Sequence, residues 1–188
     1  MPNHCESDLT IRGDPTTLTQ LYIAAQGLEG IEHDEYAAVI LLSAQSFIPL
    51  PPEALTNELK CQTCSHTEIG PASGEISWKR CPNGHKLLLD WYNRAGYDWC
   101  IGNWGTKWGL YDVKMTGDDF ESGEVSYTFR TAWSPPVPVI KAMSEKFPTL
   151  RFDLRYYESG GGYQGQAVFE AGATIKEWEG AYHGSRGG

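Results

Sequence analysis

Two stretches of this chain, one near each end, combine an alternating strand pattern with a helical pattern, and this combination most restricts how the chain can fold. Near the start, Leu9 and Ile11 alternate with polar residues, which is the pattern of a half-buried strand. Asp14 followed by Pro15 is typical of a helix N-cap and its first helical position. We therefore predict a strand and then a helix over residues 15–26. The apolar stripe of this helix comprises Leu18, Leu21, Tyr22 and Ala25.

The second half of the chain repeats this order. Apolar residues alternate over 125–129 and, most regularly, over 150–156, and both patterns predict strands. Between them a proline-rich loop leads into a predicted helix over 138–147, which Pro148 ends. The apolar positions of these three segments are Val125, Tyr127, Phe129, Ile140, Met143, Phe147, Leu150, Phe152, Leu154 and Tyr156.

These strand–helix–strand units predict the fold class. Placed on one sheet, they form an α+β fold: a ferredoxin-like antiparallel sheet with two helices on one face. We assign residues 1–50 and 109–180 to this domain, with return strands after the glycine turn that follows Ser159. Residues 51–108 do not fit the scheme and are predicted to be an insertion. Residues 181–188 are predicted to be a flexible tail.

The charge of the chain limits its partners. Fifteen Lys and Arg residues stand against 24 Asp and Glu residues, which gives a net charge of −9 at pH 7. A protein that grips a phosphate backbone needs a positive surface, so nucleic acid is the less favoured partner. The acidity either serves solubility or provides a surface that docks on a basic partner. The longest apolar run, residues 37–42, is far too short to cross a membrane, and we expect a cytoplasmic protein.

Four of the six cysteine and histidine residues in the insertion have the spacing of a metal site. Cys61 and Cys64 form a C-x2-C pair, and after sixteen intervening residues Cys81 and His85 follow as C-x3-H. Zinc favours four thiolate or imidazole ligands in a tetrahedron, and two tight turns supply them. We predict one structural zinc ion per chain and a small zinc-ribbon-like module with its knuckles over residues 60–86.

Two details of this site stay open at the level of sequence. His66 could replace His85 as the fourth ligand. The pairs could also be ordinary buried cysteine turns without metal. The remaining thiols, Cys5 and Cys100, have no assigned role, and the odd number of cysteines argues against a disulfide framework.

An aromatic segment over residues 91–108 is the second notable part of the insertion. It places Lys107 between Trp104 and Trp108 on a glycine-broken turn, and Trp133 lies in the proline-rich loop further on. Such rings can stack on a ligand or anchor a protein interface, and they can equally pack the insertion onto the sheet. We name these four residues as candidate partner-binding residues. The acidic candidates, expected to steer a basic partner, are Asp118, Asp119, Glu121 and Glu124.

The sequence offers little support for catalysis. His4 and Cys5 are adjacent on a predicted strand and point to opposite sides, so they cannot form a nucleophile–base pair directly. Asp118 and Asp119 lie in a polar loop, without the burial that tunes a catalytic carboxyl group. We name no catalytic residue and expect a protein that is not an enzyme.

Several short strings of the chain are distinctive: Pro2–Cys5 with Leu9–Gly13, Phe47–Pro49, Trp104–Trp108, Thr131–Pro136, and Tyr157–Glu158 with the glycines that follow. Together they resemble strings of the phage- and plasmid-borne Api-like family. The resemblance implies a mobile-element origin and a ferredoxin-like domain in the C-terminal part. It transfers no activity and no catalytic residue.

Together these observations predict an accessory protein of a phage or other mobile element. We expect it to bind a host protein without turnover, with a defence-system component of basic surface as the partner, in the manner of an anti-CRISPR or other counter-defence protein. The alternative is a nucleic-acid-binding module that uses the zinc ribbon and the Trp104–Lys107–Trp108 surface.

Overall fold

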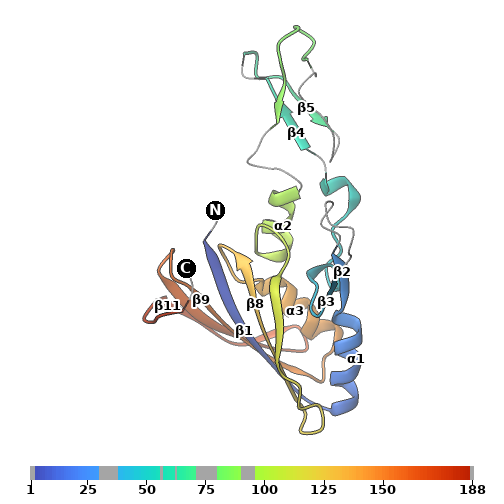
Figure 1. Cartoon of the computed structure of the whole chain (residues 1–188), viewed down its shortest axis with the longest axis vertical. Helices are drawn as coiled ribbons and strands as arrows, with labels where there is room; N and C mark the ends of the chain where they lie inside the picture. Colours follow the sequence, from blue (N-terminus) through green and yellow to red (C-terminus); the bar gives the residue numbers. More distant parts are fainter. Residues whose placement is uncertain are drawn as a thin grey trace.

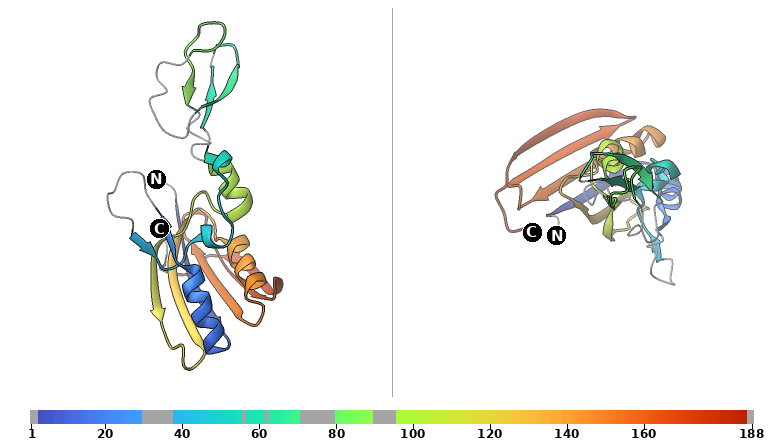
Figure 2. Two further views of the ribbon diagram at one scale, coloured as in Figure 1. Left: turned by 90° about the vertical axis from the view of Figure 1, so that its right-hand side faces the viewer. Right: turned by 90° about the horizontal axis from the view of Figure 1, so that it is seen from above.

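The main body of the molecule is a six-stranded antiparallel sheet with helices on one face (Figures 1 and 2). The computed structural model describes residues 3–29, 38–55, 57–61, 63–70, 80–89 and 96–186. The strand order is β11-β10-β9-β1-β8-β7. The strands are β1 (His4–Arg12), β7 (Tyr111–Gly117), β8 (Glu124–Ala132), β9 (Arg151–Glu158), β10 (Tyr163–Glu170) and β11 (Ala173–Ala181).

The two predicted helices both cover the same face of this sheet (Figure 2). Helix α1 (Pro15–Ala25) begins where predicted, because the Asp14 carboxylate accepts a hydrogen bond of 2.9 Å from the backbone N–H of Thr17. Helix α3 (Val137–Lys146) buries Ile140 and Met143, as its apolar stripe predicted. These side chains share one core with the buried side of the sheet.

The topology is that of a ferredoxin-like domain. In chain order, β1, α1, β7, β8, α3 and β9 form a β-α-β-β-α-β unit in which β1 lies between β8 and β9. All neighbouring strands in the sheet are antiparallel. The predicted α+β class and ferredoxin-like domain are therefore confirmed, and β10 and β11 extend the sheet beyond β9.

The core follows the period-two pattern of the strands. Leu9 pairs with Leu154 on one side and with Tyr127 on the other, and Ile11 pairs with Phe152. All five side chains are buried under the helices. The alternate residues of the same strands face the opposite, uncovered side of the sheet, so one face is apolar and the other is polar.

Between α1 and β7 the chain forms several short elements that the sequence analysis did not place. They are strands β2 (Gly27–Glu29) and β3 (Ala38–Ile40), the 3-10 helices η1 (Ala44–Ser46) and η2 (Pro52–Leu55), and helix α2 (Tyr97–Trp104). Helix α2 occupies part of the segment that was expected to be a turn. Gly96 and Gly105 flank it with φ of 78° each, so the glycines delimit a helix here rather than interrupt the segment.

A second, smaller sheet lies apart from the main one, beyond α2 (Figure 1 and Figure 2, left). It consists of β4 (Asn57–Lys60), β5 (Thr67–Gly70) and β6 (Leu88–Leu89), in the order β5-β4-β6. This small module has a separate buried cluster of Leu59, Cys61, Cys81 and Leu87. By contrast, Cys100 and Trp104 of α2 belong to the main core.

Within the predicted tail, Tyr182 donates its backbone N–H to the carbonyl oxygen of Gly162 at 2.9 Å, and Arg186 reaches the uncovered face of the sheet. Residues 187–188 lie outside the described residues. In the described part of the chain, no helix combines the length and the apolar composition needed to span a bilayer.

The position of Phe152 yields a stability prediction. Its side chain is completely buried beside Ile11 and Phe169, so Phe152→Ala should lower the free energy of unfolding by about 3–5 kcal/mol. Urea denaturation followed by circular dichroism measures this change. Arg155→Ala, on the same strand but facing solvent, is the control and should change stability by less than about 0.5 kcal/mol. A loss for Phe152→Ala no larger than that of the control would contradict the assigned core.

Candidate metal centre and predicted interaction residues

The four predicted metal ligands come together in the small module. The sulfur atoms of Cys61, Cys64 and Cys81 and a ring nitrogen of His85 all lie within 4.8 Å of one another. The Sγ atom of Cys64 is 3.4 Å from that of Cys61 and 3.6 Å from that of Cys81. This cluster could hold a metal ion, because four soft or borderline donors converge on one point.

Two tight turns present these side chains. In the first, the Cys61 N–H donates to the His66 carbonyl at 2.9 Å, and Ser65 adopts a positive φ of 55°. In the second, the Cys81 N–H donates to the His85 carbonyl at 2.9 Å, and Gly84 adopts a φ of 77°. The turns have the same construction, with a ligand at the start and a left-handed residue before the chain returns.

The structure distinguishes between the two histidines. The Nδ1 atom of His85 is buried, and no hydrogen-bond partner meets it within the described part of the chain. His66 lies outside the cluster, with its Nε2 atom 3.8 Å from a carboxylate oxygen of Glu68. A ring nitrogen of His85 lies with the three sulfur atoms, and the buried Nδ1 of the same ring has no other partner there, so His85 is the fourth member of the candidate site.

The surroundings of Cys61 make its thiol more acidic than that of an ordinary cysteine. Burial opposes ionisation of Cys61, yet the backbone N–H groups of Cys64 and Thr63 point at its sulfur and lower its pKa to about 6. A thiolate therefore forms at Cys61 near neutral pH, which is the form that binds a metal.

The two other cysteines are separate from the candidate metal centre. Cys5 and Cys100 are buried in the main core. Burial raises the pKa of the Cys5 thiol to about 12 and that of Cys100 to about 11. Both groups are therefore protonated at neutral pH and behave as small apolar side chains.

Trp104 corrects the prediction of its surface position. Its side chain is only 3% exposed and lies in the main core, where its indole Nε1–H donates to the Ile48 carbonyl at 2.8 Å. The helical position of Trp104, one turn after Cys100, turns both residues to the same buried face of α2. Trp91 and Tyr92 of the predicted aromatic segment lie outside the described residues.

The other aromatic candidates gather around Lys107. The Nζ atom of Lys107 lies 4.5 Å from the ring centroid of Trp133, 4.7 Å from that of Tyr97 and 5.8 Å from that of Trp108. We call these four residues the Lys107 cluster. Trp133 is 40% exposed and is its most accessible ring. The sequence suggested three of its members, whereas Tyr97 joins it only because α2 lies beside the 105–108 loop.

The acidic candidates lie at the opposite end of β8 from Trp133. Glu124 begins β8 and is paired with Arg12 at 2.7 Å. Eight residue steps along the strand separate Glu124 from Ala132, or about 26 Å at ~3.3 Å per residue. Hydrogen bonds from the backbone and side chain of Ser122 lower the pKa of Asp119, which therefore serves to hold the turn. The exposed acidic residues of this turn are Asp118, Asp119 and Glu121. The structure thus does not join the aromatic and acidic candidates into one surface.

A group that sequence reasoning missed is the row of ion pairs on the uncovered face of the sheet. Arg130 pairs with Glu6 at 3.0 Å and with Asp112 at 3.4 Å, and Arg186 pairs with Asp8 and Glu6. The partners are far apart in sequence, so only the strand order brings them together. In the sequence, these ion-pairing residues could be recognised only as the polar positions that alternate with apolar ones along each strand.

Comparisons with known proteins agree with this fold. Residues 110–185 match the family model described as a ferredoxin-like domain in Api92-like protein. A search of curated proteins returned no match. Among solved structures, the crystal structure of the protein Api92 from Yersinia pseudotuberculosis is similar, with a TM-score of 0.51 and 12% sequence identity. The similarity covers 99% of this chain and 100% of that chain, and at this identity it shows the fold alone. The second half of this chain is thus similar to the ferredoxin-like domain of Api92-like proteins.

Proposed function

We propose that this protein is a non-enzymatic accessory protein of a phage or other mobile element that acts by binding a host protein. The partner is a component of a host defence system with a basic surface, to which a chain of net charge −9 is attracted over long range. The mobile-element origin rests on the short strings shared with the Api-like family. The binding role rests on Trp133.

Trp133 has the properties of an interface anchor. Tryptophan is the residue most enriched among side chains that dominate binding energy, and this ring is 40% exposed in a loop. Its backbone has a φ of 68°, a conformation that costs a bulky residue roughly 1–3 kcal/mol and persists only where the surroundings impose it. A ring displayed at such a cost supports a functional role over a chance exposure.

Backbone and side-chain hydrogen bonds hold the Trp133 loop in place. The Trp133 N–H donates to the Asn3 carbonyl at 3.0 Å, and the Tyr163 hydroxyl donates to the Trp133 carbonyl. The Ser134 hydroxyl donates to the Gly105 carbonyl, and the Thr106 hydroxyl donates to the Ala132 carbonyl at 2.9 Å. These bonds join the 105–108 and 131–136 loops, so little conformational entropy is lost when a partner covers the ring.

Nucleic-acid binding remains the alternative, and the charges of the sheet disfavour it. In single-strand RNA readers of related topology, aromatic residues on the sheet stack on bases. Here the central strand β1 presents Glu6 and Asp8 on the uncovered face, and Arg12, Arg130 and Arg186 are paired with carboxylates. A titration with random-sequence nucleic acid at several salt concentrations tests this alternative, because phosphate contacts give a steep salt dependence.

The first prediction of this proposal concerns Trp133. Trp133→Ala should abolish capture of the host partner from lysate while leaving the melting temperature within about 2 °C of the parent. Ile23→Ala, which removes a 67% exposed side chain from α1, is the matched surface control and should retain the partner. Trp104→Ala should instead lower the melting temperature, because that ring is in the core. If Trp133→Ala captures the same proteins as the parent, the proposed anchor is wrong.

We also propose that the metal is zinc and that its role is structural. Two thiolates bound to one tetrahedral zinc ion at ~2.3 Å lie about 3.8 Å apart, close to the 3.4 Å and 3.6 Å between the sulfur atoms here. Four protein ligands leave no position for a reacting water. The buried cluster of the module is too small to hold three short strands without such a crosslink.

The metal site yields a second prediction. Protein purified without added metal should contain about one equivalent of zinc by elemental analysis. Cys64→Ala and His85→Ala should lose it, with faster amide exchange confined to the small module. Cys100→Ala and His66→Ala, which alter residues of the same types outside the cluster, should retain it. Retention of zinc by His85→Ala together with its loss from His66→Ala would show that the assigned ligand set is wrong.

A further inference from the structure

The uncovered face of the sheet binds an arginine side chain from the chain itself. The guanidinium of Arg186 donates to both carboxylate oxygens of Asp8, with 2.8 Å between Nη2 and Oδ1. Its Nε atom lies 3.7 Å from a carboxylate oxygen of Glu6, and its Cζ atom lies 4.5 Å above the ring of Tyr157. Two carboxylates and an aromatic face are the surroundings that a guanidinium prefers.

The strands themselves create this site. Glu6 and Asp8 are two residues apart on β1 and therefore point to the same face. Tyr157 on β9 is the register partner of Glu6, which places its ring beside the two carboxylates. Glu6, Asp8 and Tyr157 thus lie on central strands of the sheet, whereas Arg186 reaches them from a segment after the last strand.

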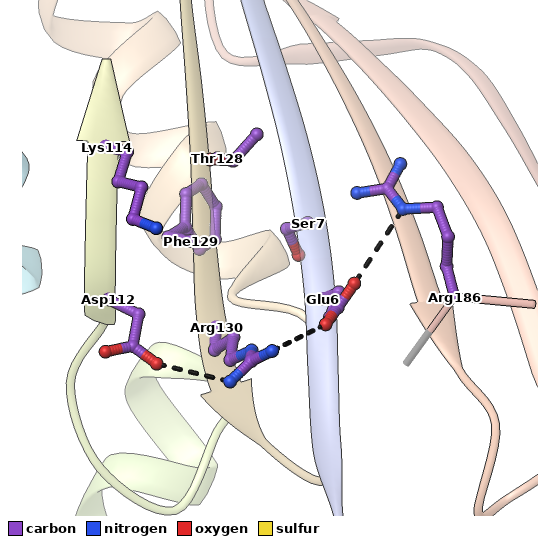
Figure 3. A pocket seen from close by; sticks show the side chains of 8 residues that line it. All are labelled: Glu6, Ser7, Asp112, Lys114, Thr128, Phe129, Arg130 and Arg186. Carbon is purple, nitrogen blue, oxygen red and sulfur yellow. Dashed lines mark hydrogen bonds and ion pairs between the residues drawn. The ribbon is translucent and has the colours of Figure 1, made fainter. Parts of the chain in front are cut away.

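A pocket of about 350 Å³ adjoins the bound guanidinium (Figure 3). Glu6 stands between Arg186 and Arg130 and pairs with both, and Asp112 pairs with Arg130 on the far side. Space therefore remains next to Arg186 for the rest of an incoming side chain and its backbone. Thr128 and Lys114 line the same pocket.

The contacts of Arg186 suit an exchangeable side chain. It is 43% exposed on its side chain, and exposed ion pairs each contribute only about 0–1 kcal/mol. Its tether is short, with Tyr182 fixed to the turn at Gly162, so the local concentration of the guanidinium at the site is high. An arginine of another molecule can therefore replace Arg186 at this site only when further contacts support its binding or when Arg186 is removed.

We propose that Glu6, Asp8 and Tyr157 form an arginine-binding site for a basic partner protein, and that Arg186 fills this site until the partner replaces it. The inference rests on the proposed function, because it names the chemistry by which the same partner is recognised. It explains how an acidic protein selects among basic surfaces. A bidentate carboxylate and a ring face accept a planar guanidinium better than a lysine ammonium.

The test uses a pentapeptide, acetyl-Gly-Ser-Arg-Gly-Gly-amide, and its lysine counterpart. Each is titrated into the full chain, and chemical shifts of backbone amides are followed by NMR. The Arg186→Ala variant should bind the arginine peptide at least about fivefold more tightly than the parent, since the tethered competitor is gone. The shifts should map to Glu6, Asp8 and Tyr157, and the lysine peptide should bind more weakly.

A matched pair of carboxylate variants completes the test. In the Arg186→Ala background, Asp8→Asn should lose peptide binding, whereas Asp112→Asn, which alters a carboxylate of the same pocket that does not touch Arg186, should retain it. Equal binding by Arg186→Ala and the parent, or equal binding of the arginine and lysine peptides, would overturn the inference. This outcome is independent of the Trp133 experiment. If Trp133→Ala loses the host partner but the peptides do not bind at Glu6, Asp8 and Tyr157, the proposed function stands and only this inference is wrong.

Discussion

The pairing of β1 with two strands from the far end of the chain is the interaction on which the rest of the structure depends. β1 lies in the middle of the ferredoxin-like unit and pairs with both β8 and β9, so that Glu6 contacts Arg130 from 124 residues away. This register decides which residues are covered by α1 and α3 and which stay open. A shift of one residue would expose Leu9 and Ile11 and bury Glu6 and Asp8.

The same pairing explains where the small module can lie. The chain leaves the domain after α1 and must return at β7 to complete the sheet, and the small module formed in between lies beyond α2, at one end of the molecule (Figure 1). Helix α2 and its Trp104 remain on the main core, whereas the cysteine turns lie beyond it. The module has only a small buried cluster of its own, and its four candidate metal ligands lie beside that cluster.

The two surfaces on which the proposed binding role rests are close enough for one partner to contact both. Arg130, opposite Glu6, lies three residues before Trp133, or about 10 Å along the strand direction at ~3.3 Å per residue. A protein that covers the Trp133 ring at the end of β8 thus also approaches the carboxylates of β1. The acidic turn at the other end of β8 is outside such a footprint and would act only through its long-range field.

The sequence by itself determined those features that depend on local spacing. Alternation over 150–156 and the Asp14–Pro15 start of α1 predicted the strands and helices, and two cysteine turns predicted the metal ligands, because these patterns act within a few residues. Only the tertiary structure decided between His85 and His66, moved Trp104 into the core, and assembled the Lys107 cluster and the Arg186 site. The physical reason is that each of these outcomes depends on contacts between segments far apart in the chain, and residue spacing carries no information about which distant segments will pack together.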